Sequence, residues 1–295
     1  MNNIKNEYCY LCDSSDFVIR PGCVRDSKDI DILECVNCGL VYLSSSDHIT
    51  NEHYENSGMH DSAQVDIGSW VKETQGDDKR RYEFVKDKII NNRVLDFGCG
   101  TGGFLNLAKI SASKVAGIEL EKALQTLFKE NGLNVFPNLE IAKKEGGKWD
   151  LITAFHVVEH LPDPKYILRE LACLLSDEGE LIIEVPNSND ALLTLYNNKD
   201  FQNFTYWSQH LYLFNQKTLS ELVKQAGLRL DWIKHVQRYP LSNHLYWLAN
   251  GKPGGQSKLS FMNNKILDFE YENELASLGM TDTIIAGISR HNACI

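Results

Sequence analysis

Short apolar runs alternate with segments of helical periodicity along most of the chain, from about residue 81 onward. The apolar runs predict seven strands, over Arg93–Phe97, Lys114–Glu119, Asn134–Phe136, Asp150–Phe155, Glu180–Val185, Arg229–Val236 and Thr283–Ile288. The segments between them predict helices over Arg81–Ile90, Gly103–Ile110, Lys122–Asn131, Lys165–Leu175 and Gln216–Gln225. Alternation of this kind builds a sheet covered by helices on both faces. The predicted fold class is therefore α/β, a doubly wound, mainly parallel seven-stranded sheet over residues 81–295.

The first 45 residues carry a different signal, two cysteine pairs with metal-ligand spacing. Cys9 and Cys12 form one pair, Cys35 and Cys38 form the other, and 22 residues separate the pairs. Two such knuckles in a segment too short for a core of its own are typical of a four-cysteine zinc site. We therefore predict a zinc ribbon over residues 1–45, with Zn²⁺ bound by these four thiolates. Four free thiols remain the alternative.

Polar residues dominate the stretch that follows, residues 46–80. We predict a linker with one or two lid helices packed over the next domain. Tyr54 is a candidate substrate-binding residue in this stretch, although scattered aromatic and histidine side chains are more often plain surface residues.

Charge and composition limit the classes of molecule with which the chain is expected to interact. The chain of 295 residues has a formal net charge of −10, which disfavours nucleic acid and anionic membranes as partners. The N-terminus lacks the apolar core of a signal peptide, and no segment reaches the roughly 18 apolar residues of a membrane span. We therefore expect a cytoplasmic protein, in which the eight cysteines are thiols or metal ligands rather than disulfides. The oligomeric state stays open.

A glycine-rich turn follows the first predicted strand of the sheet and opens a helix. Glycines are required in such a turn because they reach backbone angles closed to other residues and let a ligand touch the main chain. A dinucleotide-binding turn looks similar, but here Asp96 stands two positions before the first glycine, Gly98. A carboxylate at that position suits an ammonium group on the ligand. Glu119 ends the next strand, where it is placed to bind two ribose hydroxyls; a solvated strand-end charge is the alternative.

These motifs together resemble the class I S-adenosylmethionine-dependent methyltransferases. Val94–Gly102 resembles their first motif, Gly117–Glu119 the second, Trp149–Leu161 the fourth-strand segment and Gly179–Asn187 the fifth strand. The resemblance implies that the glycines contact the methionine part of S-adenosylmethionine and that Phe155 and His156 lie beside its sulfonium. Asn138 and Leu139 are expected at the adenine, although the acid usual there is missing. The cofactor-binding residues implied are Asp96, Gly98, Cys99, Gly100, Gly102, Phe104, Glu119, Leu120, Asn138, Leu139, Phe155 and His156.

The acceptor is expected to be a small molecule. A zinc ribbon, a methyltransferase domain and the aromatic segment Trp207–Phe214 are similar to a group that acts on sugars, including nucleotide-sugar and surface-polysaccharide methyltransferases. The C-methylating members of that group carry a further C-terminal domain that this chain is too short to hold, so we expect O-methylation of a sugar or similar polar metabolite. Candidate substrate-binding residues are Tyr54, Trp207, Arg238, Tyr239, Asn243 and His244. The connection that carries the last four is equally compatible with a hairpin packed on the sheet edge.

Removal of a hydroxyl proton favours a histidine as general base. His210, in the aromatic segment, is the first candidate, followed by His156 and His160 near the fourth strand. A structural histidine is the alternative for each. Three other functions stay open: C- or N-methylation of a nucleotide-sugar, a zinc-ribbon nucleic-acid binder and a non-catalytic module. The first 45 residues hold more acidic than basic residues, which disfavours nucleic-acid binding.

Overall fold

The computed structural model describes residues 5–49 and 66–291. Its central sheet has seven strands in the order β10-β11-β8-β7-β4-β5-β6. These are β4 Arg93–Phe97, β5 Lys114–Ile118, β6 Val135–Phe136, β7 Trp149–Phe155, β8 Leu175–Pro186, β10 Leu228–Val236 and β11 Thr283–Arg290. The five neighbouring strands β8, β7, β4, β5 and β6 pair in parallel, whereas β11 is antiparallel to both of its neighbours, β8 and β10. The predicted fold class is confirmed.

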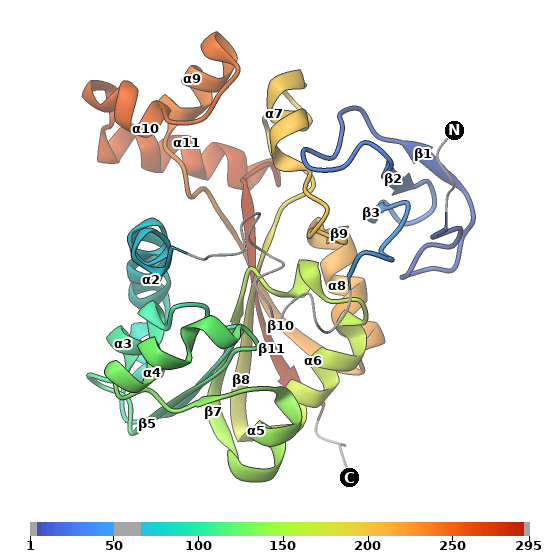
Figure 1. The fold of residues 1–295 in the computed structure, drawn as a ribbon. Helices are drawn as coiled ribbons and strands as arrows, with labels where there is room; N and C mark the ends of the chain where they lie inside the picture. The colour runs from blue at the N-terminus through green and yellow to red at the C-terminus, as the bar shows by residue number, and fades with distance from the viewer. Residues whose placement is uncertain (1–4, 50–65, 292–295) are drawn as a thin grey trace.

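Helices cover both faces of this sheet (Figure 1). One face packs against α2 Ile67–Ile89, α3 Gly103–Ala108 and α4 Gln125–Glu130, the other against α5 Leu139–Glu145, α6 Pro164–Cys173 and α8 Gln216–Gln225. Side chains alternate between the two cores along each strand. In β8, for example, Ile182 joins the core under α2, while Leu181 and Ile183 join the other.

Helix α2 differs most from the sequence prediction. The expected helix over Arg81–Ile90 begins instead at Ile67, so the predicted boundary at residue 80 falls inside one continuous helix. Asp66 caps its start, because its carboxylate accepts hydrogen bonds from the backbone N–H and the hydroxyl of Ser69 at 3.1 and 2.7 Å. Gly76 inside the helix costs about 1 kcal/mol relative to alanine, which the cap and the tertiary contacts of the helix offset.

The cysteine-bearing segment forms a second, four-stranded sheet in the order β1-β2-β3-β9. Its strands are β1 Phe17–Ile19, β2 Ile32–Cys35, β3 Val41–Leu43 and β9 Tyr212–Leu213. The last strand comes from the aromatic segment of the main domain and pairs with β3 through Val41–Leu213 and Tyr42–Tyr212. The ribbon is therefore built into the main domain: one set of its buried side chains, including Leu33 and Leu40, shares a hydrophobic core with α6 and α8, and another, including Ile32 and Val41, packs against Tyr206 and Leu213.

Further helices lie beyond the carboxyl ends of the parallel strands, at the top of Figure 1. They are α7 Lys199–Thr205, α9 Leu241–Asn250, α10 Gly255–Lys258 and α11 Lys265–Ser277. The hairpin considered for the segment after β10 is wrong: that segment is helical, with Gly251 ending α9 in the left-handed conformation. Among the helices in the described ranges, none is both long and apolar enough to span a lipid bilayer.

Candidate functional site

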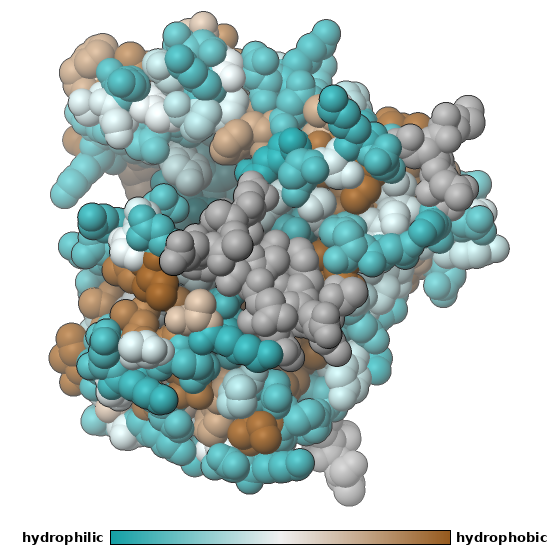
Figure 2. Space-filling view, viewed as in Figure 1, coloured by the Kyte–Doolittle hydropathy of each residue, from teal (hydrophilic) through white to brown (hydrophobic). Residues whose placement is uncertain are grey.

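A cleft of about 1040 Å³ lies at the carboxyl ends of the parallel strands. Its walls come from the glycine turn, α2, the loop before β9, α9 and the ribbon, and Figure 2 shows the surface hollowed between the α9–α11 helices and α2. Sites for one small ligand occupy roughly 300–1,000 Å³. The cleft is therefore large enough for a cofactor and a second small molecule together.

The glycine turn between β4 and α3 forms one side of the cleft. Gly98 has a φ of +69°, in the left-handed region, and a Cβ at this position would lie 2.5 Å from Cγ2 of Val157. Only glycine satisfies both constraints. Cys99, Gly100 and Phe104 line the cleft beside it. Gly102 does not line the cleft; it stands at the start of α3, where it caps the helix in the left-handed conformation.

Two carboxyl groups flank the turn. Asp96 is buried on β4 and lines the cleft, and its Oδ1 accepts a hydrogen bond from Thr153 Oγ1 at 2.7 Å. Burial raises the pKa of Asp96 to about 7. Glu119, after β5, accepts hydrogen bonds from the backbone N–H groups of Gly100 at 2.8 Å and Glu121 at 3.0 Å. This arrangement ties the strand end to the turn and keeps Glu119 and Leu120 in the cleft wall.

The predicted adenine residues lie elsewhere. Asn138 caps α5, and its Oδ1 accepts a hydrogen bond from the Ile141 backbone N–H at 3.0 Å. Neither Asn138 nor Leu139 is among the described residues that line the cleft. Their expected contact with adenine stays a prediction.

The end of β7 brings Phe155 and His156 into the cleft, next to α2. The Arg81 guanidinium lies over the Phe155 ring, 5.1 Å from its centroid. His156 has a φ of +55°, and its two ring nitrogens lie 3.0 Å from Glu159 and 3.1 Å from Glu184. Burial and Arg238 lower the pKa of His156, but the hydrogen bonds with Glu159 and Glu184 outweigh them and raise it.

Glu184 is a buried acid that pairs with residues of the cleft wall and that the sequence analysis missed. Its carboxylate is fully buried and accepts hydrogen bonds from Arg80 at 2.9 Å and Arg81 at 3.0 Å. Burial raises the pKa of Glu184, but the hydrogen bond with His156 and the positive charges of Arg81, His156 and Arg80 outweigh it and lower the pKa well below the usual range. One signal was present: a single acid inside the apolar run Leu181–Val185. Arg80 and Arg81 of α2 therefore point toward this carboxylate in the interior and not toward solvent.

Arg238 lines the cleft, but its guanidinium is already paired. It forms an ion pair with Asp77 of α2, its Nε lies 3.2 Å from Asp77 Oδ1, and Nη1 lies 3.1 Å from His156 Nε2. Its backbone N–H donates to Asp282 at 3.0 Å. The predicted bidentate grip on an anionic substrate group does not fit this pairing, because the planar fork binds an internal carboxylate.

Aromatic side chains form the opposite half of the cleft. Trp207, Phe204, Trp247 and Tyr239 line it, and the ribbon contributes Arg25. The Arg25 guanidinium lies 4.5 Å from the centroid of Trp207 and 5.8 Å from that of Phe204. No sequence signal pointed to Arg25, because its position depends on how the ribbon packs.

The remaining predicted substrate contacts have structural partners. Asn243 Oδ1 accepts hydrogen bonds from the backbone N–H groups of Gly254 at 3.3 Å and Gly255 at 3.1 Å. His244 lies 2.7 Å from the Tyr271 hydroxyl, and burial lowers its pKa to about 4. Both line the cleft, so their predicted contact with substrate remains open. Tyr54 falls outside the described residues.

Two of the three candidate bases lie together. The rings of His160 and His210 are 5.0 Å apart, centroid to centroid, and both line the cleft. Nδ1 of His160 lies 2.8 Å from the Gln209 carbonyl oxygen. Burial and His160 lower the pKa of His210 to about 3, so this ring is neutral at pH 7 and accepts a proton weakly. Which histidine acts as base stays a prediction.

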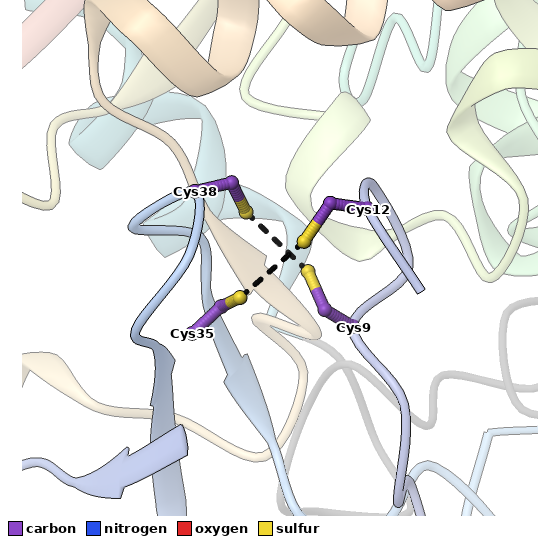
Figure 3. Close-up of side chains that lie close together, drawn as sticks. All are labelled: Cys9, Cys12, Cys35 and Cys38. Atoms are coloured by element: carbon purple, nitrogen blue, oxygen red, sulfur yellow. Dashed lines mark hydrogen bonds between the residues drawn. The ribbon is translucent and has the colours of Figure 1, made fainter. Parts of the chain in front are cut away.

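The four predicted metal ligands converge at one point of the ribbon (Figure 3). Sγ of Cys9 lies 3.4 Å from that of Cys38, and Sγ of Cys12 lies 3.5 Å from that of Cys35. These separations exceed the disulfide bond length of about 2.05 Å and approach the roughly 3.8 Å edge of a tetrahedral Zn–S site. Burial raises the pKa of the Cys9 thiol well above its usual range, so a thiolate there requires a cation beside it.

Comparison with known proteins identifies the family to which the chain belongs. Residues 70–231 match a family model described as a methyltransferase domain. A ubiquinone biosynthesis O-methyltransferase from Bordetella pertussis is 30% identical over 193 residues, which cover 61% of this chain and 76% of that protein. The enzyme of the same description from Coxiella burnetii is 29% identical over 178 residues, covering 55% and 75% of the two chains.

A solved methyltransferase from Thermotoga maritima, which depends on S-adenosylmethionine, shares the fold with a TM-score of 0.51 at 17% identity. It covers 82% of this chain and 100% of its own. The family match spans the glycine turn, both flanking carboxylates and the end of β7. The chain therefore belongs to the methyltransferase domain family and is an S-adenosylmethionine-dependent methyltransferase.

Proposed function

We propose that the chain methylates a hydroxyl group of a small, ring-bearing acceptor, a sugar or a comparable polar metabolite. The observation that carries the proposal is the division of the cleft. One half holds the glycine turn with Asp96 and Glu119, while the other is lined by the aromatic side chains Trp207 and Phe204, with the Arg25 guanidinium over both rings. Flat aromatic faces suit a ring, and the neighbouring charged groups suit its polar substituents.

In the donor half, the residues fit S-adenosylmethionine. The open backbone at the glycine turn suits the amino-acid portion, Asp96 suits its ammonium group and Glu119 suits the ribose hydroxyls. The bound cofactor supplies an electrophilic methyl carbon. Phe155 and Arg81 shield that part of the cleft from water, and Glu184 holds Arg81 in place.

In the acceptor half, the chain must align the hydroxyl and receive its proton. An oxygen–carbon bond forms while the sulfur–carbon bond breaks, the electron pair of the broken bond stays on sulfur, and the hydroxyl proton leaves. We place the group that receives this proton among His210, His160 and His156. His210 keeps its place as first candidate because it lines the cleft in contact with Trp207, at a centroid separation of 5.5 Å, although its low pKa makes it a weak base.

Calorimetry with S-adenosylhomocysteine tests the donor half. The wild type should bind, Asp96→Ala should lose binding, and His210→Gln should bind normally while turning over slowly with an accepted substrate. Absence of binding to the wild type would overturn the proposal.

A second acceptor class is favoured by the relatives, which are described as ubiquinone biosynthesis O-methyltransferases. The aromatic ring of a quinone precursor would pack against the same side chains, Trp207 and Phe204, and present its hydroxyl to the methyl donor. Transfer of a labelled methyl group to a panel of sugars, nucleotide-sugars and ring-hydroxylated aromatics separates the two classes. Labelling of the aromatics alone would replace the sugar by the quinone precursor.

We further propose that Cys9, Cys12, Cys35 and Cys38 hold Zn²⁺. Support comes from their convergence and from the burial of Cys9. The loop between the pairs carries Arg25 to the acceptor half, so the metal would stabilise that wall of the cleft. Measurement of zinc in the purified protein, with Cys35→Ser as the variant, tests the assignment; zinc retained by the variant would contradict it.

A further inference from the structure

A second cluster of potential metal ligands borders the cleft, far from the cysteines in sequence: His160 and His210 line the cleft, and Glu159 is buried behind them. Glu159 and His160 belong to the short 3-10 helix Val158–His160 that follows β7, and His210 precedes β9. One ligand atom from each of the three residues lies within 4.8 Å of the others. That separation is short enough for one ion to contact all three.

Two atoms of this cluster lack partners. Oε2 of Glu159 and Nδ1 of His210 are buried, and neither has a hydrogen-bond partner among the described residues. The Glu159 side chain is fully buried. An unsatisfied buried polar atom costs about 1–3 kcal/mol. Two of them on neighbouring residues of one cluster indicate a missing ligand with positive charge or with hydrogens to donate.

The surrounding contacts orient the cluster as they do around bound metals. Nδ1 of His160 lies 2.8 Å from the Gln209 carbonyl oxygen, which only accepts, so Nδ1 carries the proton and Nε2 keeps its lone pair. Oε1 of Glu159 is held by His156 at 3.0 Å. A metal-ligating histidine commonly donates its other N–H to a carbonyl in this way.

The donor set selects the kind of ion. Two imidazole nitrogens and one carboxylate oxygen suit zinc and similar divalent transition metals. Mg²⁺ and Ca²⁺ prefer sets made of oxygen atoms. A three-ligand set also leaves coordination positions open, and His160 and His210 both line the cleft, on the side where Trp207 stands.

We propose that Glu159, His160 and His210 bind a divalent transition-metal ion of the zinc type in the acceptor half of the cleft. With this ion bound, His160 and His210 act as ligands and not as the general base, which leaves the proton-accepting role to His156 among the three candidates. An open position of the ion takes an oxygen of the acceptor or a water molecule. Binding of the metal does not depend on which acceptor is methylated, so it can be tested without substrate. A proton relay that binds no metal is the competing account of the same cluster.

The test is metal titration of the full chain with Co²⁺, followed by absorption spectroscopy and elemental analysis after gel filtration. Wild type should bind two equivalents, one with the intense thiolate charge-transfer bands of a cysteine site and one with only weak d–d bands. His210→Gln should lose the second equivalent and keep the first. His235→Gln, on β10 and outside the cleft lining, is the matched control and should keep both.

The outcomes separate this proposal from the other two. One equivalent with thiolate bands in the wild type, or two equivalents retained in His210→Gln, overturns the Glu159–His160–His210 site. One equivalent without thiolate bands supports this site and contradicts zinc at the cysteines. Binding of S-adenosylhomocysteine, measured on every variant, reports on folding and on the donor half. Glu159→Gln provides a second, independent loss of the same equivalent.

Discussion

Replacing Gly98 by alanine should destabilise the chain through two effects that can be measured separately. The φ of +69° at this position lies in the left-handed region, where a residue with a Cβ costs about 1–2 kcal/mol. The new Cβ would also lie 2.5 Å from Cγ2 and 3.2 Å from Cγ1 of Val157, and overpacking of this kind costs about 1–3 kcal/mol. The free energy of unfolding should therefore fall by roughly 2–5 kcal/mol.

Val157→Ala separates the two contributions. It removes both γ carbons and leaves only the Cβ of residue 157, which lies 3.5 Å from the new methyl group, an ordinary van der Waals distance. In the double variant the overpacking disappears and only the backbone strain remains. The two substitutions should therefore be coupled by about 1–3 kcal/mol, so that the double variant is more stable than the sum of the single effects predicts.

The assay is urea unfolding of the wild type, both single variants and the double variant, followed by tryptophan fluorescence. Gly132→Ala is the matched control, because Gly132 has a φ of +60° and its added Cβ meets nothing within 4 Å. It should lose about 1–2 kcal/mol and show no coupling to Val157→Ala. Effects of Gly98→Ala and Val157→Ala that add to within about 0.5 kcal/mol would refute the close approach of the turn to Val157.

Three further predictions concern the two halves of the cleft. Glu119→Gln replaces one acceptor oxygen by an NH₂ group. It should weaken the binding of S-adenosylhomocysteine by roughly 10–150-fold, since a hydrogen bond to a charged group contributes about 1.5–3 kcal/mol. Equal affinities of this variant and of the exposed control Glu140→Gln, measured by calorimetry, would contradict the ribose role. Burial raises the pKa of Asp96 to about 7, and an ammonium partner would lower it again. Affinity for the same ligand should therefore rise up to tenfold per pH unit between about pH 5 and 7 and then level off; a flat profile, as expected for Asp96→Asn, would count against that pairing. Arg25→Ala should raise the KM for the acceptor several-fold and leave the affinity for S-adenosylhomocysteine unchanged, whereas parallel loss of both would assign Arg25 a structural role beside Trp207.

The parts that sequence reasoning predicted well are those determined by local patterns. Strand β4 occupies Arg93–Phe97 and helix α8 occupies Gln216–Gln225, the bounds expected from periodicity. A strand, a glycine turn and a helix adjoin one another in the chain, so their arrangement follows from neighbouring residues. The convergence of the cysteine pairs is likewise anticipated by their spacing, because each pair forms a knuckle of its own.

The parts that it missed depend on contacts between distant segments. The first half of α2 lies in the polar stretch predicted as a linker with one or two lid helices, and the prediction separated it from the helix that begins the main domain. In the folded chain Asp77 lines the cleft and pairs with Arg238, while Arg80 pairs with the buried Glu184. A helix whose inner face is polar, because it pairs with buried charged groups, lacks the periodic apolar positions from which a helix is predicted. The position of Glu184 on the α2 side of β8 follows from strand alternation only once the neighbouring helix is known.

The two halves of the cleft are held in place by different parts of the chain. This difference suggests which part determines the choice of acceptor. The donor half lies within the family match of residues 70–231. Part of the acceptor half is anchored to the ribbon, outside that match: Asp26 accepts hydrogen bonds from the backbone N–H and hydroxyl of Ser208 at 3.0 and 2.7 Å, and the Arg25 backbone N–H donates to Tyr206. We therefore expect changes in the ribbon to shift Trp207 and Arg25 and to leave the glycine turn in place. On the proposed division of the cleft, acceptor specificity can change through the ribbon while the methyl donor site stays the same.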